Sequence, residues 1–214
     1  MESKLDKKKQ RGENTRKALI VSTIDCLDRL GYAETSINRV LEGVDVSRGA
    51  LMHHFPSKED LVIGTVDFLL SRILRHYQVE SPSSFPFVQT GGPGRGSFAD
   101  TLVAYWKNII DTPEGRAFTE IIMATRTDKA LSQRISGRLE NWNDELDRFF
   151  LPPNLDAKAA QDMTLTLVIL RSFIRGMIFQ QEFHSDPSYI EKIIRRFSQI
   201  LEPHLTLNTL TSNQ

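Results

Sequence analysis

The stretch from Thr35 to Lys58 constrains the fold of this 214-residue chain more than any other part of the sequence. It reads TSINRVLEGVDVSRGALMHHFPSK, and its first half places apolar residues at the helical spacing i, i+3 and i+4: Ile37, Val40 and Leu41. Residues 43–46 interrupt this period, and Asp45 tolerates the left-handed backbone that a sharp turn requires. Ser47 is a favoured N-cap and predicts a second helix over residues 47–55. The stretch therefore predicts two short helices joined by a tight turn.

The outer face of the second helix carries small side chains and hydrogen-bond donors in place of apolar residues. Small residues let a backbone approach closely, so such a helix fits the DNA major groove with its N-terminal residues on base edges. We expect Arg48 to read bases, and His54 and Lys58 to bind phosphates. The complete predicted DNA-binding set is Thr35, Ser47, Arg48, Gly49, Ala50, His53, His54 and Lys58.

This helix-turn-helix resembles that of the TetR family of bacterial transcriptional regulators, whose signature matches residues 46–61, VSRGALMHHFPSKEDL. The similarity extends upstream over residues 15–31. Two positions depart from the family pattern: Asp45 replaces the usual turn glycine, and Met52 replaces a tyrosine that commonly touches the DNA backbone. The resemblance implies an all-α regulator that binds operator DNA as a homodimer and usually responds to a small organic effector.

Helical patterns dominate the rest of the chain, and no stretch shows convincing strand alternation. A first helix is predicted over residues 15–30 and a fourth over 57–78, before a Pro- and Gly-rich stretch at 79–96 that is typical of a long loop. We expect an all-α fold of about nine helices, with an N-terminal three-helix DNA-binding domain and a C-terminal helical domain. The predicted divisions are a flexible basic arm at residues 1–14, a helix-turn-helix domain at 15–60, a ligand-binding and dimerisation domain at 61–206 and a tail at 207–214.

Positive charge is concentrated at the N-terminus, although the whole chain, with 27 basic and 27 acidic residues, has no formal net charge. Residues 1–17 contain seven Lys or Arg against three Asp or Glu, a local excess of four positive charges. Beside a helix-turn-helix, such a segment suits contact with phosphates or with the minor groove. A disordered solubilising tail is the alternative interpretation.

Composition and motifs argue against several other classes of protein. Cys26 is the single cysteine, which rules out an intrachain disulfide and favours a reducing, cytoplasmic location. The longest apolar run, residues 165–170, is far shorter than the ~20 residues of a membrane span, so we expect no membrane association. His53 and His54 are adjacent and point about 100° apart on a helix, which does not suit a shared metal. The sequence contains no catalytic or nucleotide-binding motif, so we expect no cofactor and no enzymatic activity.

Residues 156–182 have apolar side chains on more than one face, whereas a helix that is wet on one face needs a single apolar stripe. One face suits packing within the helix's own domain. The other, together with the last helix after Pro187, suits packing against a second copy as a four-helix bundle, as the resemblance also implies. The predicted dimer-interface residues are Ile174, Ile178, Ile190, Ile194, Phe197 and Leu201.

The C-terminal half has more large apolar side chains than simple bundle packing requires. Aromatic and Met side chains beside a few polar groups line small-molecule pockets, and an Arg side chain offers a cation to an anionic ligand. Ordinary core packing of the aromatic residues and ion pairing of the arginines are the alternative. The predicted ligand-binding residues are Trp106, Phe118, Met123, Arg126, Trp142, Arg171, Phe173 and Met177.

These features together predict a homodimeric repressor that binds a pseudo-palindromic operator and is released by a small amphipathic organic effector. The fourth helix, residues 57–77, would couple the two sites reciprocally. An activator, or a regulator without an effector, would share the same fold. A helical enzyme or interaction protein with a vestigial helix-turn-helix is a further alternative, against which the intact recognition face argues.

Overall fold

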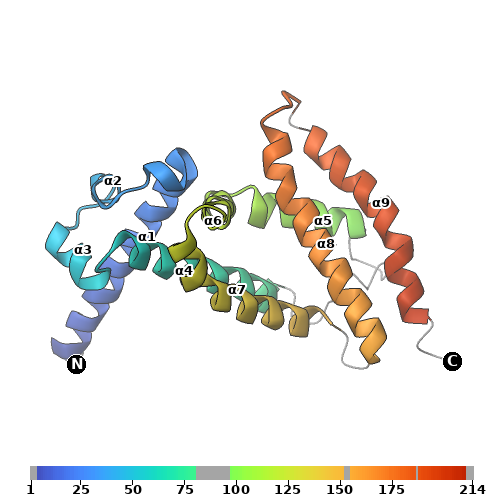
Figure 1. The fold of residues 1–214 in the computed structure, drawn as a ribbon, viewed down its shortest axis with the longest axis horizontal. Helices are drawn as coiled ribbons and strands as arrows, with labels where there is room; N and C mark the ends of the chain where they lie inside the picture. Colours follow the sequence, from blue (N-terminus) through green and yellow to red (C-terminus); the bar gives the residue numbers. More distant parts are fainter. Residues whose placement is uncertain (1–3, 81–96, 152–154, 187, 211–214) are drawn as a thin grey trace. The chain divides into compact units, whose positions relative to one another are not determined.

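The computed structural model describes residues 4–80, 97–151, 155–186 and 188–210. All regular structure in these ranges is helical, which confirms the predicted all-α class and its nine α-helices (Figure 1). Residues 79 and 80 of the predicted loop belong to the fourth helix, and the remainder of that loop, residues 81–96, lies outside the described residues. The elements are α1 Lys4–Glu34, α2 Ile37–Glu42, α3 Arg48–His54, α4 Lys58–Glu80, α5 Phe98–Tyr105, the π-helical segment η1 Trp106–Ile110, α6 Pro113–Ala124, α7 Lys129–Phe150, α8 Ala157–Gln181 and α9 Tyr189–Leu210.

The chain divides into two compact units. Unit 1 comprises Met1–Arg72 and Pro113–Leu139, and unit 2 comprises Ile73–Thr112 and Glu140–Gln214. Unit 1 therefore contains α6 and the start of α7 in addition to the helix-turn-helix.

The core of unit 1 forms where the apolar face of α1 meets α2, α3 and α4. Helix α1 begins at Lys4, well before the predicted start at Thr15, so the segment expected as a basic arm is helical from Lys4 onward. From Asp6 onward, where the side chains are described, the first buried one is that of Leu19. Residues of the helix-turn-helix core with little or no exposure are Leu19, Ile20, Ile24, Leu27, Val40, Leu51, Phe55, Leu61, Val62 and Val66.

Helix α1 also packs extensively on α6 within unit 1. The guanidinium of Arg116 on α6 donates to both carboxylate oxygens of Asp28, at 2.6 and 3.2 Å. Among the described residues, Gly31 alone has a positive φ, +75°, and a Cβ there would stand 3.0 Å from a carboxylate oxygen of Glu120. Glycine allows the kink at this point, because L side chains rarely adopt that backbone conformation.

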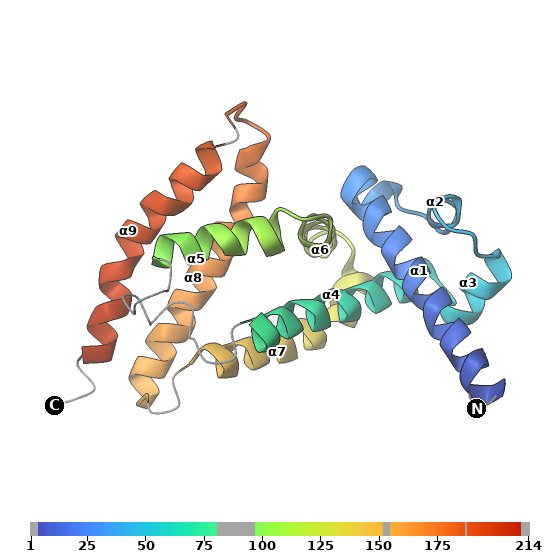
Figure 2. The ribbon, with the colours of Figure 1, turned by 180° about the vertical axis from the view of Figure 1, so that it is seen from behind.

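Unit 2 is built on α5, η1, α8 and α9. Figure 2 shows α8 and α9 running side by side, and α5 also contacts α9. Ser97 and Asp100 form a capping box at the start of α5, and Asp156 caps α8 by accepting from the Ala159 N–H. The buried apolar residues of this unit are Phe98, Leu102, Val103, Trp106, Ile110, Trp142, Leu146, Phe150, Met163, Leu167, Leu170, Ile174, Met177, Ile190 and Ile194.

Ion pairs connect α9 to α5 and η1 across the surface of unit 2. Arg195 lies 2.8 Å from both Asp100 and Glu191, and Lys107 lies 2.8 Å from Glu191. Exposed pairs of this kind contribute little individually, but a connected network fixes side-chain geometry. In the part of the chain that the structure describes, no helix combines the length and apolar character needed to cross a membrane.

Candidate nucleic-acid interface

Helices α2 and α3 are connected by a turn that packs tightly on α1. A Cβ on Gly43 would stand 2.6 Å from the Ser22 hydroxyl oxygen, so only glycine fits here without displacement. The same hydroxyl donates to the Val40 carbonyl at 2.7 Å and ties α2 to α1. Asp45 does not adopt the left-handed conformation expected for it, because no described residue other than Gly31 has a positive φ. The turn is therefore tight through the close approach of Gly43 and not through strain at Asp45.

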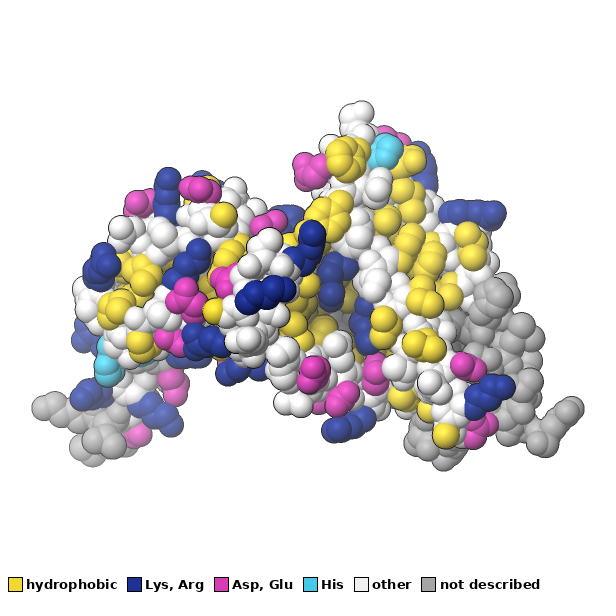
Figure 3. All heavy atoms as spheres, viewed as in Figure 1, with side chains coloured by type: hydrophobic (Ala, Val, Ile, Leu, Met, Phe, Trp, Pro, Cys, Tyr) yellow, Lys and Arg dark blue, Asp and Glu magenta, His cyan; other side chains and the backbone are white. Residues whose placement is uncertain are grey.

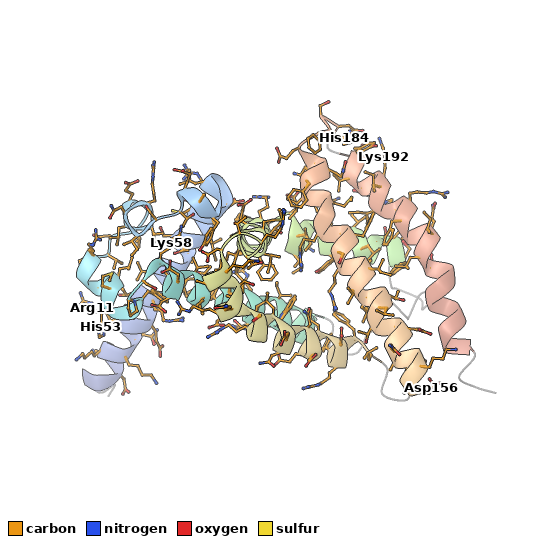
Figure 4. All side chains as sticks on the ribbon, in the orientation of Figure 1. Arg11, His53, Lys58, Asp156, His184 and Lys192 are labelled. Carbon is orange, nitrogen blue, oxygen red and sulfur yellow. The ribbon has the colours of Figure 1, made fainter. Side chains whose placement is uncertain are left out.

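Helix α3 begins as predicted, because the Ser47 hydroxyl accepts from the Ala50 N–H at 3.2 Å. Leu51 is buried and the Phe55 ring is almost so, which fixes the inner face of the helix. The outer face then presents Arg48, Gly49 and His53 to solvent. Figure 4 labels His53 at the C-terminal end of α3.

Arg48 is held in position by a residue of α2. Its Nη1 donates to the Asn38 side-chain oxygen at 3.0 Å, and both residues are exposed. Sequence reasoning overlooked Asn38 and its neighbour Arg39, which share the exposed side of α2. The sequence could have predicted their exposure, because Asn38 and Arg39 directly precede the buried Val40 and residues next to a core position on a short helix face outward.

Neither packing nor backbone conformation within the chain requires glycine at position 49. A Cβ at this position would meet nothing within 4 Å, and its φ is not positive. Glycine inside a helix is less favourable than alanine by roughly 0.5–1 kcal/mol. The backbone at Gly49 is therefore open to close approach from outside the chain.

Two of the predicted DNA-binding residues are engaged within the chain. Thr35 is 1% exposed, and its hydroxyl donates to the Gly31 carbonyl at 2.7 Å, so the prediction that it contacts DNA is wrong. Lys58, labelled in Figure 4, donates to the Tyr32 carbonyl at 2.9 Å, which places its ammonium group in the junction of α1 and α4. The expected phosphate contact of Lys58 conflicts with this placement, because the junction draws the charged group inward.

His54 is half-buried at the end of α3. The pKa of His54 is lowered, first because burial disfavours the charged form and then through electrostatic interaction with His53 and Arg16. A neutral imidazole retains one N–H donor, so His54 can still donate to a phosphate without carrying a charge.

The predicted ligand-binding residues are divided between the two units. Phe118, Met123 and Arg126 belong to unit 1, where Phe118 is buried and the other two are exposed. The remaining five belong to unit 2: Trp106, Trp142, Arg171, Phe173 and Met177. Arg171 forms an ion pair with Asp147 at 3.1 Å, and the side chains of both are at least four-fifths buried. Arg171 therefore forms an ion pair with an acid, which was the alternative to binding an anionic ligand.

The prediction of two apolar stripes on α8 is confirmed, but three of the predicted dimer residues, one on α8 and two on α9, face inward. Ile174, Ile190 and Ile194 are buried within their own chain and are unable to contact a second copy. Phe197 is half-buried and stacks on Phe173 with ring centroids 3.7 Å apart, and Ile178 and Leu201 are half-buried. Helical spacing predicts two apolar faces but does not show which one packs within the domain. The inward-facing isoleucines were therefore predicted as interface residues.

The exposed stripe of α8 consists of other residues. Figure 3 shows hydrophobic side chains gathered along this helix. The large exposed apolar residues of α8, the following turn and α9 are Leu165, Val168, Ile169, Phe179, Phe183, Tyr189 and Ile200.

Comparison with known proteins agrees with this architecture. The family model described as bacterial regulatory proteins, tetR family, matches residues 19–64, which contain the whole of α2 and α3. The HTH-type transcriptional regulator CymR of Pseudomonas putida is 38% identical over 64 residues, which are 30% of this chain and 32% of that protein. This chain thus spans about a third of the length of that relative.

Two solved structures share the fold over most of the chain. A transcriptional regulator of Rhodococcus sp. Rha1 has a TM-score of 0.58 at 18% identity and covers 88% of this chain and 96% of its own. The multidrug binding protein EbrR, complexed with imidazole, has a TM-score of 0.51 at 17% identity and covers 89% of each chain. TetR-family regulators are transcription factors and not enzymes, in agreement with the sequence-based expectation. Residues 19–64 thus match the tetR family of bacterial regulatory proteins, and the solved structures share the all-α fold of the chain.

Proposed function

We propose that this chain regulates transcription by placing α3 in the major groove of an operator. The observation that carries this proposal is the exposed face of α3, where Gly49 leaves the backbone uncovered beside the side chain of Arg48. A groove wall that approaches Gly49 would bring Arg48, one residue inside the helix, within reach of base edges. The proposed DNA-contacting residues are Asn38, Ser47, Arg48, Gly49, Ala50, His53 and His54.

Arg48 is the proposed base-reading residue. An arginine that binds the O6 and N7 atoms of guanine with two hydrogen bonds is the commonest specific contact in the major groove. The hydrogen bond from Arg48 to Asn38 restricts the guanidinium before DNA arrives, which lowers the ordering cost of that contact. Asn38 is the proposed positioning residue.

The operator-binding species is proposed to be a homodimer that forms through the exposed stripe of α8. Leu165, Ile169 and Phe179 share this stripe, and Phe183, which follows the helix, is 76% exposed. Gly176 lies between them in the sequence, and a Cβ there would meet nothing within 4 Å. A second copy of α8 crossing at Gly176 would cover this apolar surface, as helices do in a four-helix bundle. Two recognition helices about one duplex turn apart would then read a pseudo-palindrome.

A small organic effector is proposed to release the operator, which would make the protein a repressor. Similarity to the tetR family supports a ligand-responsive regulator, and the structurally similar EbrR is described as a multidrug binding protein. Within unit 2, Arg171 is paired with Asp147, so an organic acid would bind Arg171 by replacing this carboxylate. Release requires only that the effector bind the DNA-free form more tightly, and a coupling of about 1–3 kcal/mol weakens operator binding roughly 5- to 150-fold. An activator with the same fold would show the opposite change in promoter output.

The experiment that tests the DNA-binding proposal is selection from random duplexes followed by gel shift. We expect wild-type protein to enrich a pseudo-palindrome with guanine in each half-site. Arg48→Ala should lose about 1–3 kcal/mol at one position of each half-site and relax the base preference there. Lys158→Ala, an exposed substitution on α8, is the matched control and should leave the selected motif unchanged. Failure of wild-type protein to enrich any sequence would contradict the proposal.

A further inference from the structure

The first turns of α1 extend beyond the core of unit 1. The side chains of residues 6–17 are exposed or half-buried, and the first buried one is that of Leu19. A short helical segment without an apolar contact face is marginal by itself in water. The extension is therefore a surface element whose contacts come from its charged side chains.

An open hollow of about 490 Å³ lies between this extension and the end of α3. Lys8, Lys9, Gly12 and Arg16 line it from α1, and His54 lines it from α3. Two acids, Asp6 and Glu13, also belong to its lining. The hollow thus brings residues of the N-terminal extension together with a residue of the proposed DNA surface.

Two features of the hollow fix its shape. The Arg16 guanidinium lies over the Phe55 ring, 5.2 Å from the ring centroid, which anchors this cation on the core. Gly12 leaves room between the helices, because even a Cβ there would be 3.9 Å from the nearest His54 ring atom. A longer side chain at this position would fill the hollow.

The charge of the hollow favours an anion. Lys8, Lys9 and Arg16 outnumber Asp6 and Glu13 by three to two, and His54 adds a neutral donor. The wider segment, residues 1–17, has an excess of four positive charges in a chain that is neutral as a whole. Extended polyanions respond to such a local excess, because neutralising their phosphates releases condensed counterions.

We propose that the hollow between α1 and α3 holds a backbone phosphate of duplex DNA, so that the N-terminal extension of α1 forms a second contact surface beside the recognition helix. Lys8 and Lys9 supply charge to the phosphate backbone, and His54 donates a hydrogen bond from the adjoining end of α3. DNA is the proposed occupant because the hollow is continuous, through His54, with the surface proposed to enter the major groove. This inference rests on the proposed function and adds a contribution to DNA affinity that does not depend on the base sequence.

The test is the salt dependence of DNA binding by the double variant Lys8→Gln/Lys9→Gln. Loss of two phosphate contacts should reduce the slope of log K against log salt by about 1.8, at about 0.9 per phosphate. Affinity for selected and random duplexes should fall by the same factor, and the selected motif should not change. Arg16 is left intact because it packs on Phe55, and circular dichroism confirms that both proteins are folded.

The matched control is Lys129→Gln/Lys158→Gln, which removes two exposed lysines from α7 and α8. This control should leave the slope unchanged. An unchanged slope in Lys8→Gln/Lys9→Gln, with Arg48→Ala still relaxing the motif, would overturn the second contact and leave the proposed function standing. Loss of binding to anionic phosphatidylglycerol vesicles without a change in the DNA slope would also overturn it and assign the cations to a lipid surface. Absence of any DNA binding by wild-type protein would instead overturn the proposed function.

Discussion

The ammonium group of Lys58 lies 2.9 Å from the carbonyl oxygen of Tyr32 and 4.4 Å from the centroid of the Tyr32 ring. The phenol of Tyr32 in turn donates to Asp128 at 2.8 Å, and its backbone N–H donates to Glu120. Burial and the hydrogen bond to Asp128 raise the pKa of Tyr32, so the phenol remains a neutral donor. These contacts join the end of α1 to the start of α4 and to the segment around α6, all within unit 1.

Lys58→Met should therefore lower stability more than DNA affinity. The variant keeps an apolar side chain of similar length but loses the hydrogen bond and the cation–π contact, at a cost of about 1–2 kcal/mol. Urea unfolding measures this loss, with Lys129→Met on the exposed surface of α7 as control. The salt slope of DNA binding should not change. A decrease of about 0.9 in that slope would show that Lys58 contacts a phosphate after all.

Acid should weaken the cap and ion-pair network of unit 2. Hydrogen bonds from Arg195 and Ser97 lower the pKa of Asp100 from 3.8 to about 2. A carboxylate with a lowered folded-state pKa stabilises the fold above its unfolded pKa, and this stabilisation is lost as pH falls toward about 2. Asp100→Asn should consequently be less stable than wild type at pH 7, with the difference shrinking between pH 4 and 2. Unfolding midpoints measured across this range test the effect, and a difference that stays constant with pH would refute the assignment.

A pair of substitutions distinguishes the two faces formed by α8 and α9. Ile169→Asp alters an exposed position, so the monomer should lose less than about 0.5 kcal/mol while sedimentation shows dissociation of the dimer. Ile194→Asp buries an unpaired charge in the core and should cost about 4 kcal/mol or more. If Ile169→Asp remained dimeric at micromolar concentration, the dimer would form through another surface.

The sequence predicted correctly those features that depend on a contact within a single helical turn. The cap at Ser47 appears as predicted, because a capping hydroxyl acts on the backbone of its own first turn. The two stripes of α8 were also visible as spacing. The sequence did not show which of these stripes faces the core. Ile174 and Leu165 are both apolar, and only tertiary packing buries the first and exposes the second.

At the candidate site, too, tertiary contacts were not predictable from the sequence. The exposure of Arg48 and Gly49 on the outer face of α3 was predicted from the helical spacing of Leu51 and Phe55. The contacts of Thr35 and Lys58 within the chain were not predicted, because their partners, Gly31 and Tyr32, belong to a kink at the end of α1 that helical spacing does not reveal. The π-helical turn η1 likewise gave no sequence signal, since its apolar residues continue the spacing of α5.

The placement of α3 in the major groove is tested by comparing the DNA affinity and the stability of Gly49→Leu with those of wild type. A Cβ at position 49 meets nothing within 4 Å, so the free protein should gain roughly 0.5–1 kcal/mol from the better helix former. Affinity for the selected operator should nevertheless fall about tenfold or more, because the side chain separates α3 from the groove. Gly137→Leu, at another helical glycine with open space around it, should gain similar stability without losing affinity. Unchanged operator binding by Gly49→Leu would contradict the placement of α3 in the major groove.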